Sequence, residues 1–167
     1  MRKVFLFIVM LALLMCLAAY PVQADGPYTY TLNVPSSIVI PETGKLNRLI
    51  NNNSAAQTIS CTTDDPDKTS ATVMVKDATS SDQGKLKKGG NGTAMSSALK
   101  LSGEGFTTVE VLSGTDQILV DTSQGALSGI PLTWSKNTLV ITQPPFDTAD
   151  PDAYSTVLTF TATFNGP

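Results

Sequence analysis

The sequence predicts an all-β fold: an immunoglobulin-like antiparallel β-sandwich preceded by a signal peptide that is cleaved off. Three observations support this prediction. Apolar residues recur at every second position through most of the chain, which is typical of strands with one buried and one solvated face. Clusters of Gly, Pro, Asn, Asp and Ser interrupt this alternation at short intervals. No long segment has the apolar spacing of a helix.

The start of the chain has the three parts of a secretory signal peptide. Arg2 and Lys3 supply the charged start, and a mostly apolar run covers residues 4–20. Pro21 then breaks the run, and the trio Val22-Gln23-Ala24 places small residues where a signal peptidase reads them. We therefore expect residues 1–24 to be removed by cleavage after Ala24.

Cleavage would leave residues 25–167 as a single secreted β-sandwich domain, located outside the cell or at its surface. Two alternatives stay open. The apolar run has 17 residues, near the lower limit for a membrane-spanning helix, so it can also be an uncleaved anchor. Cys16 suggests lipidation, although bulky Met15 occupies the position where such sites carry a small residue. No second apolar segment follows, so we expect no membrane span after cleavage.

The alternation divides the rest of the chain into eleven expected strands. In chain order they cover residues 28–34, 36–40, 45–50, 57–63, 71–76, 98–102, 107–112, 117–122, 130–135, 138–143 and 154–164.

The segments between these strands predict two features of the topology. Lys136-Asn137 separates two alternating segments and has the length of a two-residue hairpin turn. Residues 77–97 are polar, contain glycine and lack a pattern, so we expect a flexible loop. The only candidate for a short turn of helix is 96–101.

Two strands have faces that can be assigned directly. Ile130, Leu132 and Trp134 share one face, and we expect Trp134 to pack in the core. The strand 154–164 alternates apolar residues with an outward row of threonines, Thr159, Thr161 and Thr163. These threonines fit an ordinary solvated face. The alternative is an ice-binding face, which requires neighbouring threonine rows in register.

Composition and charge exclude several classes of function. The chain has no histidine, which removes the commonest general base and the commonest zinc ligand. We therefore expect neither an enzyme nor a bound cofactor. Without Arg2 and Lys3 the chain carries a formal net charge of −5, so nothing attracts it to nucleic acid or to an anionic membrane.

Acidic and basic clusters lie in the predicted connections. The acidic residues are Asp64, Asp65, Asp67, Asp147, Asp150 and Asp152. Closely spaced carboxylates can bind calcium, but Asp-Pro pairs more commonly open turns, and no glycine-bearing calcium loop is present. The lysines 85, 87 and 88 precede a glycine-rich stretch, which we interpret as a solvated loop able to contact an anionic partner.

The predicted mature chain keeps one cysteine, Cys61, and so has no internal disulfide. We expect Cys61 to be a small buried hydrophobe beside Ile59. The alternative is an intermolecular disulfide between subunits.

The end of the chain resembles the closing strand of secreted bacterial surface sandwiches. Fimbrial subunits and WxL-type wall-associated proteins often end in a small residue, an aromatic residue and a long alternating strand, and Ala153, Tyr154 and the segment up to Phe164 are similar. The chain departs from the WxL pattern because Phe160-Thr161-Ala162 stands where Trp-x-Leu is expected. The resemblance implies a bacterial surface or appendage protein.

These observations lead to a structural or adhesive function, as a subunit of a surface appendage or extracellular matrix. Residues 25–34 place Tyr28, Tyr30, Leu32 and Val34 at alternate positions, so this segment can complete its own sheet or that of a neighbour by strand addition. The expected partner is then a second copy or another surface protein. The alternative is a monomeric module that binds a glycan or a wall or host protein through residues 77–97 and the acidic turns.

Overall fold

The computed structural model describes residues 27–38, 50–79, 83–90, 92–111, 115–146 and 154–167. These residues form strands, turns and connecting segments and contain no helix, so the predicted all-β class is confirmed. In particular, none of them belongs to a helix long and apolar enough to cross a membrane.

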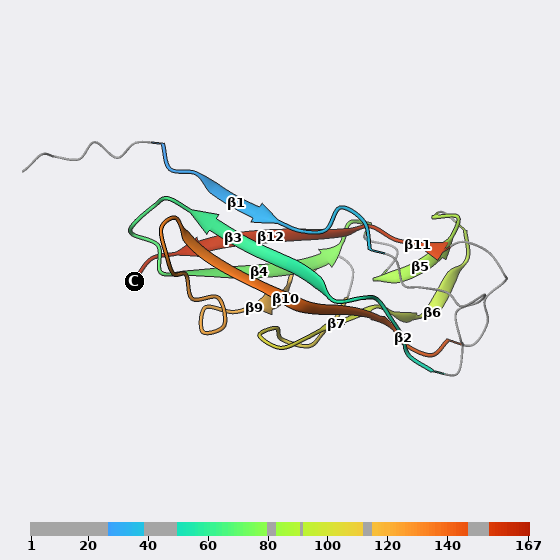
Figure 1. Ribbon diagram of the computed structural model, residues 1–167. Helices are drawn as coiled ribbons and strands as arrows, with labels where there is room; N and C mark the ends of the chain where they lie inside the picture. Colours follow the sequence, from blue (N-terminus) through green and yellow to red (C-terminus); the bar gives the residue numbers. More distant parts are fainter. Residues whose placement is uncertain (1–26, 39–49, 80–82, 91, 112–114, 147–153) are drawn as a thin grey trace, which may run out of the picture.

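The described residues form twelve strands (Figure 1). In chain order they are β1 (Tyr30–Asn33), β2 (Asn52–Asn53), β3 (Gln57–Thr63), β4 (Ser70–Asp77), β5 (Lys85–Lys88), β6 (Ala94–Ala98), β7 (Lys100–Ser102), β8 (Val109–Glu110), β9 (Gln117–Val120), β10 (Leu132–Gln143), β11 (Tyr154–Ser155) and β12 (Leu158–Asn165).

The strands form three sheets in which every pairing is antiparallel. The largest sheet has the order β1-β3-β10-β7-β8, and β2 also pairs with β10. The second sheet has the order β12-β4-β9, and the third has the order β11-β5-β6. Figure 1 shows β5, β6 and β11 together at one end of the molecule, opposite the C-terminus.

One hydrophobic core connects the sheets. Alternate residues of β3 and β4 are fully buried, because successive strand residues point to opposite faces. Trp134 of β10 is buried as predicted, and its ring packs edge-on against Phe106 with 5.8 Å between the centroids. Its indole nitrogen donates a 2.7 Å hydrogen bond to the carbonyl of Gln124, so the polar atom of this core side chain is satisfied.

The predicted hairpin at Lys136-Asn137 is wrong. A single strand, β10, runs through both residues and changes register between Lys136 and Leu139. Its first half pairs with β3, and its second half pairs with β7 and β2. The buried positions change from even to odd numbers between Trp134 and Leu139, and a bulge produces this change as readily as a hairpin turn does.

The predicted loop at 77–97 and the helical turn at 96–101 are also wrong. β5 and β6 pair within this segment, and β7 follows after Leu99. Each of the first two strands buries little apolar surface, with Leu86 in β5 and Met95 in β6 as the large buried side chains. Strands this polar show no clear alternation, so the sequence pattern missed them.

Other expected strands differ in their extent. The expected strand 154–164 is interrupted at 156–157, where the chain leaves β5 and begins to pair with β4. Residues 36–38 form no strand, and 39–49 lie outside the described residues. Ile130 was expected on the buried face with Trp134 but is fully exposed, because β10 begins only at Leu132.

The unequal burial of two isoleucines predicts unequal effects of the same substitution. Ile59→Ala removes a side chain that is 0 % exposed and should destabilise the fold by about 2–5 kcal/mol, because it leaves a cavity. Ile130→Ala, the matched control on the exposed turn, should change stability by less than about 0.5 kcal/mol. Urea unfolding followed by Trp134 fluorescence measures both, and equal losses would contradict the placement of the core.

Candidate functional site

Two unpaired strand edges lie next to each other. β12 pairs with β4 along eight residues, and no other strand among the described residues pairs with its second edge. β1 ends the largest sheet in the same way, because β3 is the only described strand that pairs with it. Cα atoms of β1 and β12 come within 8 Å of each other (Figure 1). We call the space between these two edges the open seam.

The opposite side of the molecule is joined by a backbone hydrogen bond. The amide of Thr107, just before β8, donates a 2.8 Å hydrogen bond to the carbonyl of Leu119 in β9. This bond connects the far edge of the largest sheet to the far edge of the second sheet. No equivalent backbone bond joins β1 to β12 among the described residues. The seam is therefore held by side chains.

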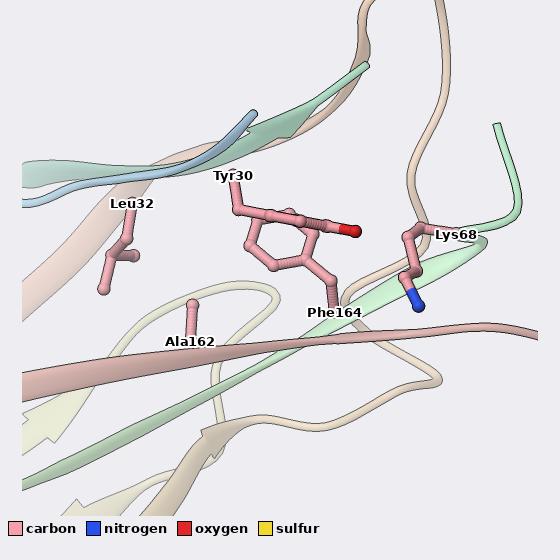
Figure 2. Close-up of a pocket in the computed structure, with 5 residues that line it drawn as sticks. All are labelled: Tyr30, Leu32, Lys68, Ala162 and Phe164. Carbon is pink, nitrogen blue, oxygen red and sulfur yellow. The ribbon is translucent and has the colours of Figure 1, made fainter. Parts of the chain in front are cut away.

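A cleft of about 360 Å³ lies at the open seam, lined by Tyr30, Leu32, Lys68, Ala162 and Phe164. Figure 2 shows the two β1 side chains facing the two β12 side chains, with the Tyr30 hydroxyl and the Lys68 ammonium toward the same end. The rings of Tyr30 and Phe164 lie 5.2 Å apart at an angle of 54°. Tyr30 remains 48 % exposed, so this aromatic contact only partly covers the seam.

The acidic turn after β3 holds the start of β1. The amide of Thr29 donates a 2.6 Å hydrogen bond to Asp64 Oδ1, and the hydroxyl of Tyr30 donates a short hydrogen bond to Asp65 Oδ2. Lys68 Nζ lies 4.0 Å from the same Asp65 oxygen. The turn therefore binds backbone and side-chain donors of β1 with two carboxylates.

The Tyr30–Asp65 hydrogen bond shifts the pKa of both groups in the expected directions. Tyr30 loses its proton less readily because the carboxylate accepts its hydrogen bond, and burial adds to this effect, so the pKa of Tyr30 rises to about 12. The same hydrogen bond lowers the pKa of Asp65, with further help from the amide of Asp67 and the charge of Lys68. Both shifts favour the ionised carboxylate beside the neutral phenol.

The structure describes three of the six acidic residues considered as calcium ligands. Asp64 and Asp65 accept protein hydrogen bonds, and within the part of the chain that is described no three His, Cys, Asp or Glu residues, Asp67 included, form a group able to hold a metal ion. Asp147, Asp150 and Asp152 lie outside the described residues.

The structure places the predicted assembly residues at the seam or next to it. Tyr30 and Leu32 line the cleft, Tyr28 precedes β1 and is half-buried, and Val34 follows β1 and is exposed. The sequence pattern missed Lys68 as a neighbour of this site. It identified the inward faces of Ala162 and Phe164, but alternation carries no signal that marks a strand as an edge.

Cys61 is buried beside the seam. It is 0 % exposed, like Ile59 on the same face, and burial raises the pKa of its thiol to about 11. Its register partners are Leu32 in β1 and Trp134 in β10. The first interpretation, a buried hydrophobe, therefore describes the folded subunit. An intermolecular disulfide would require the buried thiol to become exposed.

The outward threonines of β12 form a single row. Thr159, Thr161 and Thr163 pair with Lys76, Met74 and Thr72 of β4. Because β4 presents a lysine and a methionine at these positions, this described neighbour of β12 does not supply the second threonine row that an ice-binding face requires. The lysines expected in a loop lie in β5, and Lys87 and Lys88 both make interactions there.

Comparison with protein-family models found no match to this chain, and a search of curated proteins found no matching sequence. Inference about function therefore starts from the geometry of the open seam.

The lowered pKa of Asp65 predicts a specific loss of stability in acid. Because the pKa lies below its ordinary value of 3.8 in the folded state, Asp65 stabilises the fold above about pH 4, and this contribution is lost as the pH falls through the folded-state pKa. Asp65→Asn should therefore lose less stability than the unmodified chain between pH 5 and pH 2.

Thermal unfolding across this pH range measures the effect. Tyr30→Phe should likewise reduce the loss of stability between pH 5 and pH 2. The double variant should add little to either single change, because both substitutions remove the same Tyr30–Asp65 hydrogen bond. Parallel curves of melting temperature against pH for Asp65→Asn and the unmodified chain would contradict the role of Asp65 in the acid-induced loss of stability.

Proposed function

We propose that this chain is a secreted bacterial surface protein with a structural or adhesive role, a subunit of an appendage or extracellular matrix that assembles by β-strand addition. The observation that carries the proposal is the open seam, where the unpaired edges of β1 and β12 meet. A short strand that is paired on one side alone can be exchanged for the equivalent strand of another chain.

The sequence of β12 supports an edge that associates. Proteins commonly protect exposed edges with lysine, proline or inward-pointing charge. The eight residues of β12 contain no proline and no charged residue, and they alternate threonine with apolar side chains. This composition favours pairing with a further strand. The inward apolar side chains of β12 are only partly buried, so a partner would cover additional apolar surface.

The distance across the seam favours exchange of β1 over insertion beside it. A strand between β1 and β12 needs two strand spacings, about 9.6 Å, yet the Cα atoms of the two strands come within 8 Å. An incoming segment therefore replaces β1. Residues 27–34 of a second copy can make the same pairing with β3 and the same contact with Phe164, so exchange preserves the native contacts.

The proposal also includes the sandwich architecture and the export signal that the sequence predicts. We place the chain in the immunoglobulin-like sandwich architecture, supported by two antiparallel sheets whose inward residues share one core. Export through cleavage after Ala24 supplies the extracellular location.

The half-exposed Tyr30 beside Lys68 supports the second candidate, a monomeric module that binds a glycan or a wall or host protein in the cleft.

A cysteine placed opposite Cys61 tests strand exchange directly. Residues opposite each other in an antiparallel pair have Cα atoms about 4.5–5.5 Å apart, within the range that a disulfide spans. Leu32→Cys, in a chain with Cys16→Ser, should therefore link to Cys61 of the same subunit in a monomer and to Cys61 of the neighbour after exchange. Mild oxidation of concentrated protein should give a covalent ladder on a non-reducing gel.

The matched control is Thr31→Cys, which lies opposite Thr62 and has no cysteine across from it. Oxidation of dilute, monomeric Leu32→Cys should fix β1 in its own subunit and prevent assembly until a reductant is added. Oligomers that contain only intramolecular disulfides would contradict exchange of β1. A monomer at every concentration, in light scattering and negative-stain microscopy, would favour the binding module.

A further inference from the structure

We propose that the acidic turn formed by Asp64, Asp65 and Lys68 is a latch that holds β1 on its own subunit, and that opening this latch is the step that releases β1. The release itself follows from contacts within one chain. Its consequence, easier exchange between subunits, rests on the proposed function.

The latch acts at the end of the β1–β3 ladder. The turn follows β3 directly, and Tyr30 opposite Thr63 is the last pair of that ladder. Beyond this pair, Asp64 binds the amide of Thr29 and Asp65 binds the hydroxyl of Tyr30. Hydrogen bonds to an ionised acceptor are among the stronger hydrogen bonds in proteins, so these two contacts fasten the end where β1 would begin to peel away.

Hydrogen bonds within the turn hold the latch in position. The amide of Asp65 donates to Thr63 Oγ1 at 3.1 Å, and the amide of Asp67 donates to Asp65 Oδ1 at 3.0 Å. The amide of Lys68 donates to the carbonyl of Asp65 at 3.3 Å. One carboxylate oxygen of Asp65 is thus used inside the turn, and the other points to Tyr30. Because these hydrogen bonds already order the turn, it loses little further conformational entropy when it binds β1.

Besides the latch, β1 is held by its pairing with β3 and by side-chain contacts. The strand has four residues and one partner strand among the described residues, so only a short ladder attaches it to the sheet. The side-chain contacts of the described β1 residues include the Tyr30–Phe164 ring contact, the partly buried Leu32, and a long 3.3 Å hydrogen bond from Asn33 to Ser60. None of these lies beyond the Tyr30 end of the ladder, so loss of the latch frees the end from which β1 would open.

Cys61 reports when β1 opens. Leu32 lies directly opposite Cys61, and opposite residues of an antiparallel pair point to the same face. Leu32 therefore covers Cys61 from the side of the open seam, and the thiol is fully buried while β1 is in place. When β1 leaves, Cys61 becomes accessible to a thiol reagent.

The test uses the full chain with Cys16→Ser, so that Cys61 is the single thiol. Tyr30→Phe removes only the hydroxyl and keeps the ring on Phe164, while Asp65→Asn removes the charge of the acceptor. Each should accelerate the reaction of Cys61 with an aromatic disulfide reagent at pH 8 by roughly 5- to 30-fold, the effect of one or two kcal/mol on an opening equilibrium. This acceleration should depend weakly on low urea, because opening of one strand exposes little surface.

Asp121→Asn is the matched control. Asp121 also has a lowered pKa, and its side chain organises a turn through hydrogen bonds to Ser123 and Gln124 rather than to β1. The inference is overturned if both latch variants leave the Cys61 reaction rate unchanged, or if Asp121→Asn accelerates it equally. Tyr30→Phe keeps the test valid if Asp65→Asn does not fold.

Assembly is measured separately, as the protein concentration at which oligomers appear in light scattering. Both latch variants should lower this concentration several-fold if β1 exchanges between subunits. Faster reaction of Cys61 without oligomers at any concentration supports the latch and overturns the proposed assembly. Easier assembly with an unchanged Cys61 rate overturns the latch.

Discussion

Every open antiparallel sheet has two edges, and the unequal closure of these edges shapes the rest of this structure. On one side, the Thr107–Leu119 backbone hydrogen bond connects the largest sheet to the sheet of β12, β4 and β9. On the other side, the described residues of β1 and β12 meet through side chains, around Tyr30 and Phe164. The core between the sheets is thus bordered by a backbone hydrogen bond on one side and by a short peripheral strand on the other. The cleft lies on this second side.

The acidic turn adds two hydrogen bonds at the start of this peripheral strand. The sequence suggests Asp64 and Asp65 as possible calcium ligands, yet in the structure their carboxylate oxygens accept hydrogen bonds from the protein itself. A carboxylate used in this way stabilises one arrangement of the chain without sealing the sheet edge permanently. A strand of four residues that is fastened at one end by polar side chains can open without the rest of the fold.

Local patterns predicted much of the fold and missed specific elements for physical reasons. The alternation around Ile59 and Val73 reports a face that must be buried, so β3 and β4 were predicted closely. The change of phase before Leu139 was read as a hairpin, because a bulge and a turn shift the alternation alike. β5 and β6 were missed because strands with so little apolar burial carry almost no periodic signal.

The sequence by itself determined the all-β class, the burial of Trp134 and Cys61, and the inward and outward faces of β12. These features depend on the two-residue period of a strand, which is a local property of the chain. Only the tertiary structure decided that β12 is an edge, that β1 lies beside it, and that Tyr30 meets Asp65, which lies 35 positions further along the chain. Which strand pairs with which is set by contacts between distant segments, and no local periodicity encodes it.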